Sequence, residues 1–408
     1  MSPFFTASEL LAKGHEATQA IENLLARATD CVRARVSAEG RLSASLLENE
    51  QRAAHGLAWL ATYAEAIREL TAWGERLQAD TRLTQTEILL ISIGLGEYLA
   101  QIYGGIPMSQ GEIVRLQELG LSDDHLEASR IQAVRDLIRH GNTAESRAAF
   151  ITQIRSAQGA ACIGDPGLDE TLESIRDEMR KFAAAEVEPF AHEWHQKNAY
   201  IPMSVIEGLA GMGVFGLTLP EAYGGMGLGK VSMCVVSEEL SRAYIGVGSL
   251  GTRSEIAAEL ILCGGTEEQK NEWLPKIGSG EILPTAVFTE PNTGSDLASL
   301  RTRALRAGDV YKVTGNKTWI THPVRADLMT MLVRTNPDEP GYKGLSILLA
   351  PKARGSDADP FPAQGMTGSE IEVLGYRGMK EYELAFDGFE VPAANLLGGE
   401  EGLSLIHI

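Results

Sequence analysis

The sequence predicts an α+β protein with several domains, in which two helical regions are followed by a small antiparallel β domain. Apolar residues recur at every third or fourth position through residues 1–160 and again after residue 165, which is typical of helices. From residue 285 the pattern changes to short β-prone runs. The length of 408 residues suits two or three domains, and a hydrophobic content of 44% is ordinary for a globular protein.

Residues 1–160 are expected to form a helical bundle. Each helix carries one apolar stripe, which it would bury against its neighbours. The clearest stripes are Ala17, Ile21, Leu24, Ala28 and Val32, and then Trp59, Tyr63, Ile67 and Leu70. This helical extension contains no chemical motif.

A second helical domain is expected at 165–284, after a glycine-rich break. Asp165 can cap a helix, and Pro166 suits a first turn. One face of the next segment is apolar and comprises Leu172, Ile175, Met179, Phe182 and Val187.

Residues 285–395 are expected to form the antiparallel β domain, as a barrel or a sandwich. Asp309–Val313 and Lys317–Thr321 are β-prone and meet at Gly315-Asn316, which is typical of a hairpin. Further strands are expected at Leu328–Val333, Leu345–Ala350 and Tyr382–Val391.

The charge balance argues against two classes of partner. With 36 basic and 55 acidic residues, the formal charge is −19, which disfavours a broad nucleic-acid surface or a basic membrane anchor. The longest apolar stretch, Ile88–Leu95, is too short to cross a bilayer, and the first residues do not resemble a secretory signal. We therefore expect a soluble, cytoplasmic protein with no nucleic-acid or membrane partner.

Two patterns resemble ligand motifs without completing them. The glycine-rich stretch that ends at Lys230 nearly fits a phosphate-binding P-loop, but Val231 stands where a hydroxyl should hold magnesium. His192 and His195 could share a helix face, but no third metal ligand is evident, so no metal site is expected. We interpret the first as a loop that shapes a pocket wall, with a P-loop nucleoside triphosphatase as a distant alternative.

Two other segments could hold a planar cofactor. In residues 285–296, Thr289, Gly294 and Ser295 lie in a loop after an apolar strand, where N–H groups and hydroxyls can meet phosphates or heterocycles. Strand alternation would point Trp319 and Thr321 the same way, as an aromatic wall beside a hydroxyl. Taken singly, the first segment is better explained as a turn with polar side chains. The alternative for the second is a core aromatic residue beside a surface threonine.

In this order, the two segments resemble the acyl-CoA dehydrogenase family. Its TEP-x-x-GSD run matches Thr289–Asp296, its WIT run matches Trp319–Thr321, and a third landmark matches Phe386–Gly398. The resemblance covers about residues 165–402 and implies a helical domain, a middle β domain and a C-terminal four-helix domain, with FAD in the cleft between them.

The resemblance also implies which residues meet the cofactor. The backbone around Phe288 and Thr289 should meet the pyrimidine edge of the flavin, with the Thr289 hydroxyl near the reactive ring. Trp319 should pack on the isoalloxazine, and the Thr321 hydroxyl should lie near N5. Gly294 and Ser295 should lie by the CoA portion of the substrate or the FAD phosphates. The cofactor-binding set is completed by Val287 and Ile320.

The activity that the resemblance implies is α,β-dehydrogenation of an acyl-CoA, with electrons passing to an electron-transferring flavoprotein. The helical extension and the runs KTWITHPVRADL and YRGMKEYELAFDGFEV resemble members that convert methylsuccinyl-CoA to mesaconyl-CoA. Such a substrate ends in a carboxylate, which Arg253 could bind in a bidentate pair. An exposed surface arginine is the alternative. A homodimer or homotetramer is also implied.

The sequence departs from the family at its C-terminal end. In most members the catalytic glutamate lies in the four-helix domain, which we expect to be missing after a truncated start at 396–408, so no catalytic base is named. The poorly matching tail, 403–408, is expected to come from a truncated or frameshifted reading. An acyl-CoA oxidase and a non-catalytic flavin- or acyl-CoA-binding fragment stay open as alternatives.

Overall fold

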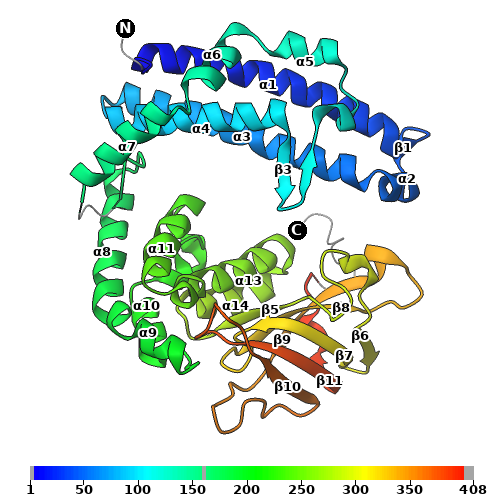
Figure 1. Ribbon diagram of the computed structural model, residues 1–408. Helices are drawn as coiled ribbons and strands as arrows, with labels where there is room; N and C mark the ends of the chain where they lie inside the picture. The colour runs from blue at the N-terminus through cyan, green and yellow to red at the C-terminus, as the bar shows by residue number, and fades with distance from the viewer. Residues whose placement is uncertain (1–3, 159–161, 399–408) are drawn as a thin grey trace. The chain divides into compact units, whose positions relative to one another are not determined.

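The computed structural model describes residues 4–158 and 162–398 and contains two compact units, Met1–Leu168 and Asp169–Ile408 (Figure 1). The predicted tail 403–408 lies outside the described residues. None of the helices in the described ranges combines the length and the apolar character that a membrane span needs.

The first unit is a helical bundle. Its helices are α1 (Ala7–Val36), α2 (Ala44–Asn49), α3 (Gln51–Ala79), α4 (Gln85–Gly104), α5 (Asp123–Ser129), α6 (Gln132–His140) and α7 (Ala144–Ser156). Two short hairpins connect them, β1 (Ser37–Ala38) with β2 (Arg41–Leu42) and β3 (Ile106–Ser109) with β4 (Glu112–Val114). The first predicted stripe is buried along α1, as expected, and it belongs to the core of this unit.

The segment that ends this unit contradicts one prediction. Asp165 does not cap the next helix, because its carboxylate forms two bonds of 2.6 Å with the Arg82 guanidinium. The N-cap is Asp169, whose side chain accepts a bond from Leu172 N at 2.8 Å. An N-cap side chain must face its own helix, and Asp165 faces Arg82 instead.

The second unit begins with seven helices among the described residues. These are α8 (Glu170–Glu186), α9 (Glu188–Gln196), α10 (Met203–Gly211), α11 (Lys230–Ala243), α12 (Ile245–Gly248), α13 (Leu250–Gly264) and α14 (Glu267–Gly278). The segment directly before the glycine-rich stretch is not a strand, because Val214–Gly216 forms a short 3-10 turn. Lys230 bonds to Glu255 at 2.8 Å and also to Glu259.

A seven-stranded sheet follows these helices. Its strands are β5 (Pro284–Val287), β6 (Arg303–Ala307), β7 (Val310–Thr321), β8 (Leu328–Arg334), β9 (Leu345–Pro351), β10 (Met366–Ile371) and β11 (Glu381–Pro392). They lie in the order β10-β11-β7-β6-β8-β5, with β9 also paired to β8. The predicted antiparallel domain is a mixed sheet instead, because β5 pairs with β8 in parallel. The connection between them includes β6 and β7 and is long enough for a parallel crossover.

The predicted hairpin at Gly315-Asn316 is also wrong. The chain from Val310 to Thr321 is one strand, and it turns instead at Gly308 between β6 and β7. Gly315 has a φ of 149°, and a Cβ there would lie 2.6 Å from Thr302 Oγ1. The glycine therefore serves a close approach inside the sheet rather than a turn.

The two faces of the sheet are buried in different cores. On β8, Leu328 and Leu332 pack with the helical residues of α13 and α14, whereas Met329 and Met331 pack in the other core. A strand covered on both faces is apolar throughout, which explains the unbroken apolar run of β8.

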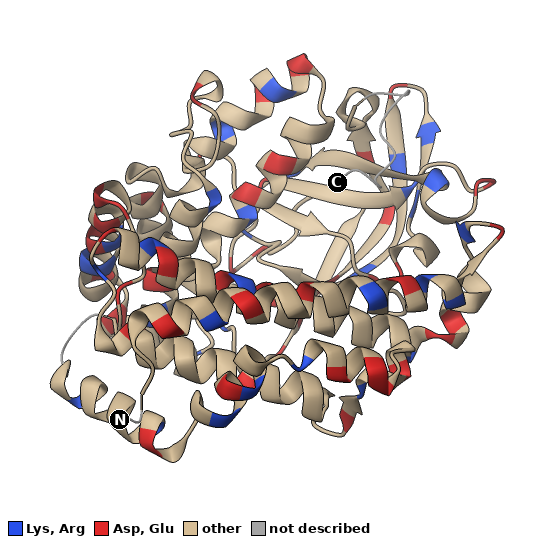
Figure 2. Ribbon diagram, turned by 90° about the horizontal axis from the view of Figure 1, so that it is seen from above, with Lys and Arg blue, Asp and Glu red and all other residues tan. Residues whose placement is uncertain are grey.

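Acidic and basic residues are interspersed along the helices (Figure 2). Several form ion pairs within one helical turn, such as Asp30–Arg33 at 3.1 Å and Glu178–Lys181 at 2.7 Å. Pairs this exposed contribute little to stability, so the cores determine the fold.

Candidate functional site

The fold brings the two candidate segments together. Thr318 N donates a hydrogen bond to Thr289 O at 2.9 Å, and the Thr285 hydroxyl donates to Thr321 O at 2.7 Å. Part of the segment after β5 therefore runs beside the end of β7. The sequence predicted a site from both segments, and the structure places them in direct contact.

A buried ion pair fixes this contact. Lys317 Nζ lies 2.7 Å from Phe288 O and 3.1 Å from Glu290 Oε1, and its side chain is fully buried. Burial lowers the pKa of Lys317 to about 8, although the Glu290 charge opposes this shift. Glu290 also accepts bonds from the backbone N–H groups of Arg301 and Thr302 at 2.7 and 2.8 Å. Sequence analysis missed this pair, because Lys317 stands between Asn316 and Thr318 and no apolar neighbour marks it as buried.

Trp319 lies at an irregularity of β7. Its φ is 57°, and the register with β11 shifts between Lys317 and Ile320. Strict alternation therefore does not hold across Trp319, so strand geometry does not place its indole on one face with Thr321. The indole is 56% exposed, whereas Thr321 is buried. An exposed indole on a fixed strand offers a flat surface to a planar ring.

The other expected cofactor residues differ in what they can offer. The side chains of Val287 and Ile320 are buried in the sheet core, so only their backbone can meet a ligand. Phe288 and Thr289 are half-buried, and Gly294 and Ser295 are exposed.

Two of these positions leave room for a ligand. Among the described residues, nothing bonds to the Thr289 hydroxyl. A Cβ on Gly294 would meet no atom within 4 Å. The unpaired Thr289 hydroxyl, the open space at Gly294 and the exposed Trp319 indole together fit a planar cofactor with polar edges.

Arg253 lies on α13 and is partly buried. Its Nη2 donates to the Tyr376 hydroxyl at 3.1 Å, and that hydroxyl donates to Ser249 Oγ at 2.7 Å. Its Nε is buried and has no partner among the described residues. Burying an N–H without a partner costs free energy, so this group is suited to bind a polar ligand atom.

Sequence analysis missed a carboxylate, Glu381, which begins β11 and pairs with Thr321 at the end of β7. The Thr321 hydroxyl donates to Glu381 Oε1 at 2.8 Å, and both side chains are buried. Burial raises the pKa of Glu381, against the opposing effects of the Thr321 bond and the Arg253 charge. Burial also lowers the pKa of the neighbouring His322 to about 4, so its imidazole is neutral at pH 7.

Positive φ angles are concentrated at the end of β7 and in the segment before β11. Four of the seven non-glycine residues with positive φ in the described chain are Trp319, His322, Tyr376 and Lys380. Such conformations persist where the surrounding structure holds them, and they cluster at functional sites.

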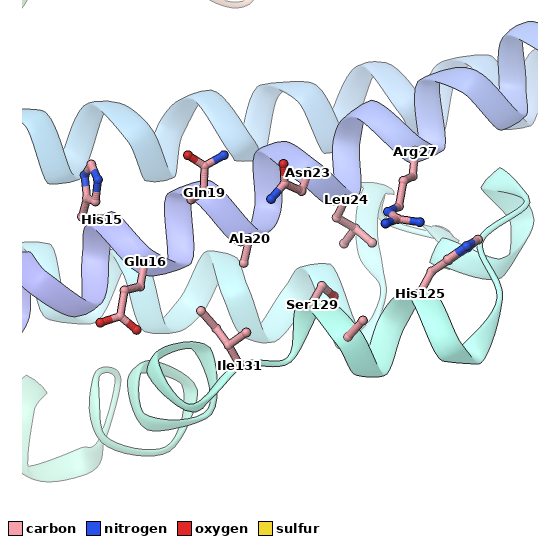
Figure 3. Close-up of a pocket in the computed structure, with 11 residues that line it drawn as sticks. His15, Glu16, Gln19, Ala20, Asn23, Leu24, Arg27, His125, Ser129 and Ile131 are labelled. Carbon is pink, nitrogen blue, oxygen red and sulfur yellow. The ribbon is translucent and has the colours of Figure 1, made fainter.

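The other candidates stay separate from these segments. His192 is exposed on α9, and no group of three or more His, Cys, Asp or Glu side chains within the described residues is arranged to hold a metal ion. A cavity of about 470 Å³ in the first unit lies between α1 and α5 (Figure 3). Its polar side chains include His15, Glu16, Arg27 and His125.

Two family models match the second unit. The model of the acyl-CoA dehydrogenase N-terminal domain matches residues 169–281, and that of the acyl-CoA dehydrogenase middle domain matches residues 285–389. The matched ranges contain both candidate segments, Arg253 and Glu381.

Individual relatives agree with these models. The chain is 58% identical over 394 residues to a (2S)-methylsuccinyl-CoA dehydrogenase of Cereibacter sphaeroides, and the match covers 97% of this chain and 71% of that protein. A crystal structure of an acyl-CoA dehydrogenase from Geobacillus kaustophilus is 34% identical with a TM-score of 0.51, covering 57% of this chain and 59% of that chain. A glutaryl-CoA dehydrogenase from Mycobacterium smegmatis in complex with FADH2 is 30% identical with a TM-score of 0.51, covering 58% of this chain and 57% of that chain.

Proposed function

This chain belongs to the acyl-CoA dehydrogenase family, and we propose that it takes part in the FAD-dependent α,β-dehydrogenation of methylsuccinyl-CoA to mesaconyl-CoA. The observation that carries the proposal is the bond from Thr318 N to Thr289 O, which joins the two cofactor segments. We further propose a cytoplasmic homodimer or homotetramer that passes its electrons to an electron-transferring flavoprotein.

The residues present fit FAD. Trp319 would hold the face of the isoalloxazine, and the hydroxyls of Thr289 and Thr321 would meet its polar edge. The carbonyls of Phe288 and Thr289 accept bonds from Lys317 and Thr318. These bonds fix the backbone that would face the polar edge of the flavin. Gly294 and Ser295 would lie by phosphate groups, because exposed backbone without a clashing side chain suits close approach.

In this reaction the chain would act by binding and orientation. Bound FAD would supply a two-electron acceptor for the hydride that leaves the β-carbon. The buried ion pair between Lys317 and Glu290 joins the two segments. It would thereby hold the Thr289 and Thr321 hydroxyls at fixed positions. The carboxylate that takes the α-proton is not assigned to a residue of this chain.

Arg253 would bind the distal carboxylate of methylsuccinyl-CoA. Its unpartnered, buried Nε supports this role, since a carboxylate would supply the missing acceptor. Tyr376 and Ser249 would orient the guanidinium through the bonds described above.

Substrate preference tests the role of Arg253. In a full-length version that also carries the catalytic base, we expect Arg253→Ala to lower kcat/KM for methylsuccinyl-CoA about a hundredfold more than for butyryl-CoA, because only the first substrate loses a charged partner. Arg253→Lys should lose an intermediate amount, since it keeps the charge without the bidentate geometry. Equal losses on both substrates would contradict the assignment.

Flavin titration tests the cofactor site. We expect Trp319→Ala to weaken FAD binding by about tenfold, the order expected when an aromatic contact is lost, with fluorescence quenching as the measurement. The control is Phe190→Ala, which removes an aromatic side chain of similar exposure on α9 and should bind FAD as the wild type does. If Trp319→Ala bound FAD as tightly as the wild type, the isoalloxazine ring would not pack on Trp319.

The relatives described above are dehydrogenases, so an oxidase is not proposed. The non-catalytic alternative predicts FAD binding without any bleaching of the flavin when methylsuccinyl-CoA is added. Bleaching in the absence of oxygen would exclude it.

A further inference from the structure

Glu381 is a buried carboxylate directly opposite Thr321. The two residues are partners in the antiparallel ladder between β7 and β11, and the Thr321 hydroxyl lies 2.8 Å from Oε1 and 3.1 Å from Oε2. Glu381 is 6% exposed. Its contact with Thr321 is therefore sheltered from water and set by strand register.

No basic side chain in the described part of the chain forms an ion pair with Glu381. Arg253 acts on it only at longer range, because its guanidinium bonds to the Tyr376 hydroxyl instead. Lys380, the preceding residue, pairs with Glu370 at 2.8 Å, and His322 is neutral at pH 7. Burial without a paired cation raises the pKa of Glu381.

We propose that Glu381 is a positioning residue that sets the direction of the hydrogen bond which Thr321 offers to the flavin. This inference rests on the proposed function, in which the Thr321 hydroxyl meets the flavin near N5.

The physical reason is that a hydroxyl has one proton. When Glu381 is ionised, Thr321 donates that proton to the carboxylate and can only accept a bond from the flavin. When Glu381 takes one proton from solvent, its O–H can donate to Thr321, whose own proton is then free to point at the flavin. An oxidised flavin offers a hydrogen-bond acceptor at N5, whereas a reduced flavin offers an N–H donor there. Protonated Glu381 therefore suits the oxidised flavin, and ionised Glu381 suits the reduced flavin.

The experiment follows FAD affinity and the visible spectrum of the FAD-loaded protein from pH 5 to pH 9. In the wild type we expect oxidised FAD to bind about two- to tenfold more weakly at pH 9 than at pH 5, the range for one neutral hydrogen bond, with a matching spectral shift. Glu381→Gln and Thr321→Val should both lose the pH-dependent change. The control Glu383→Gln, exposed on the same strand, should keep it.

Unfolding of the FAD-free protein gives a second readout. A raised pKa means that the folded state holds the proton more tightly, so this group's contribution to stability falls as pH rises above the unfolded value. Glu381→Gln should remove that fall, and Thr321→Val should keep it, because its Glu381 still titrates.

The outcomes separate the two proposals. If FAD binds and the wild type and Glu381→Gln share one pH dependence of affinity and spectrum, the role of Glu381 is overturned and the proposed function stands. If FAD does not bind at all, the proposed function fails and the role of Glu381 fails with it, whatever the FAD-free protein shows.

Discussion

Single buried polar residues determine the chemistry available around Thr321. His322 follows it directly, is 4% exposed, and has Nδ1 at 3.0 Å from Met379 O. Its Nε2 has no partner among the described residues. Because the ring is neutral when folded, it adds no positive charge beside Glu381, and protonating it would cost folding free energy.

Acid sensitivity follows from His322. The folded pKa is about 4, below the ordinary 6.5, so the unfolded chain binds a proton more readily between these values. Stability from this group is therefore complete above pH 6.5 and is lost as pH falls toward 4.

We expect the free energy of unfolding to fall by about 2 kcal/mol from this group between pH 7 and pH 5, measured with urea. His322→Asn keeps a donor for Met379 O and tolerates the positive φ, and it should lose that fall. His192→Asn, at an exposed histidine, should behave as the wild type does. If the free energy of unfolding of His322→Asn fell with pH as steeply as that of the wild type, a group other than His322 would be responsible for the acid sensitivity.

At the scale of elements, β7 carries most of the residues of the candidate site. One continuous strand carries the close approach at Gly315, the buried Lys317, the exposed Trp319 and the buried Thr321. Its pairing with β11 places Glu381, and its bond to the segment after β5 places Thr289. A change that distorts this strand should therefore affect the whole site.

Gly315→Ala tests this strand. A Cβ would lie 2.6 Å from Thr302 Oγ1 and 2.7 Å from Thr302 Cα, at a φ of 149°. We expect a loss of at least about 2 kcal/mol in the free energy of unfolding, because backbone atoms of Thr302 cannot move aside cheaply. Gly294→Ala has open space and should change stability by less than about 0.5 kcal/mol. Comparable losses in the two variants would contradict the close approach at Gly315.

At the scale of the whole molecule, the described residues form two units with separate cores. The core of the first unit comes from its own helices and the β3–β4 hairpin, and the second unit contains separate helical and sheet cores. Units with their own cores can unfold separately.

Arg82→Ala should destabilise the first unit alone. The change removes the bidentate bonds to Asp165, which are partly shielded from water. We expect the melting temperature of the first unit to fall by about 2–6 °C, and amide exchange to quicken in α3 and α4 but not in the sheet. Arg33→Ala, at an exposed pair with Asp30, is the control and should leave both units unchanged. Faster exchange in the sheet of Arg82→Ala would mean that the units unfold together.

The sequence alone determined the helical and β regions, the two candidate segments and the family, because apolar periodicity and short ordered motifs are local properties. Only the tertiary structure decided that β5 pairs in parallel, that β7 runs unbroken through Gly315, that Asp165 binds Arg82 rather than a helix end, and that Trp319 interrupts strand alternation. It also revealed Glu381 and the Lys317–Glu290 pair, whose members are far apart in sequence. Strand pairing and burial depend on contacts between distant residues, and a single sequence pattern carries no record of those contacts.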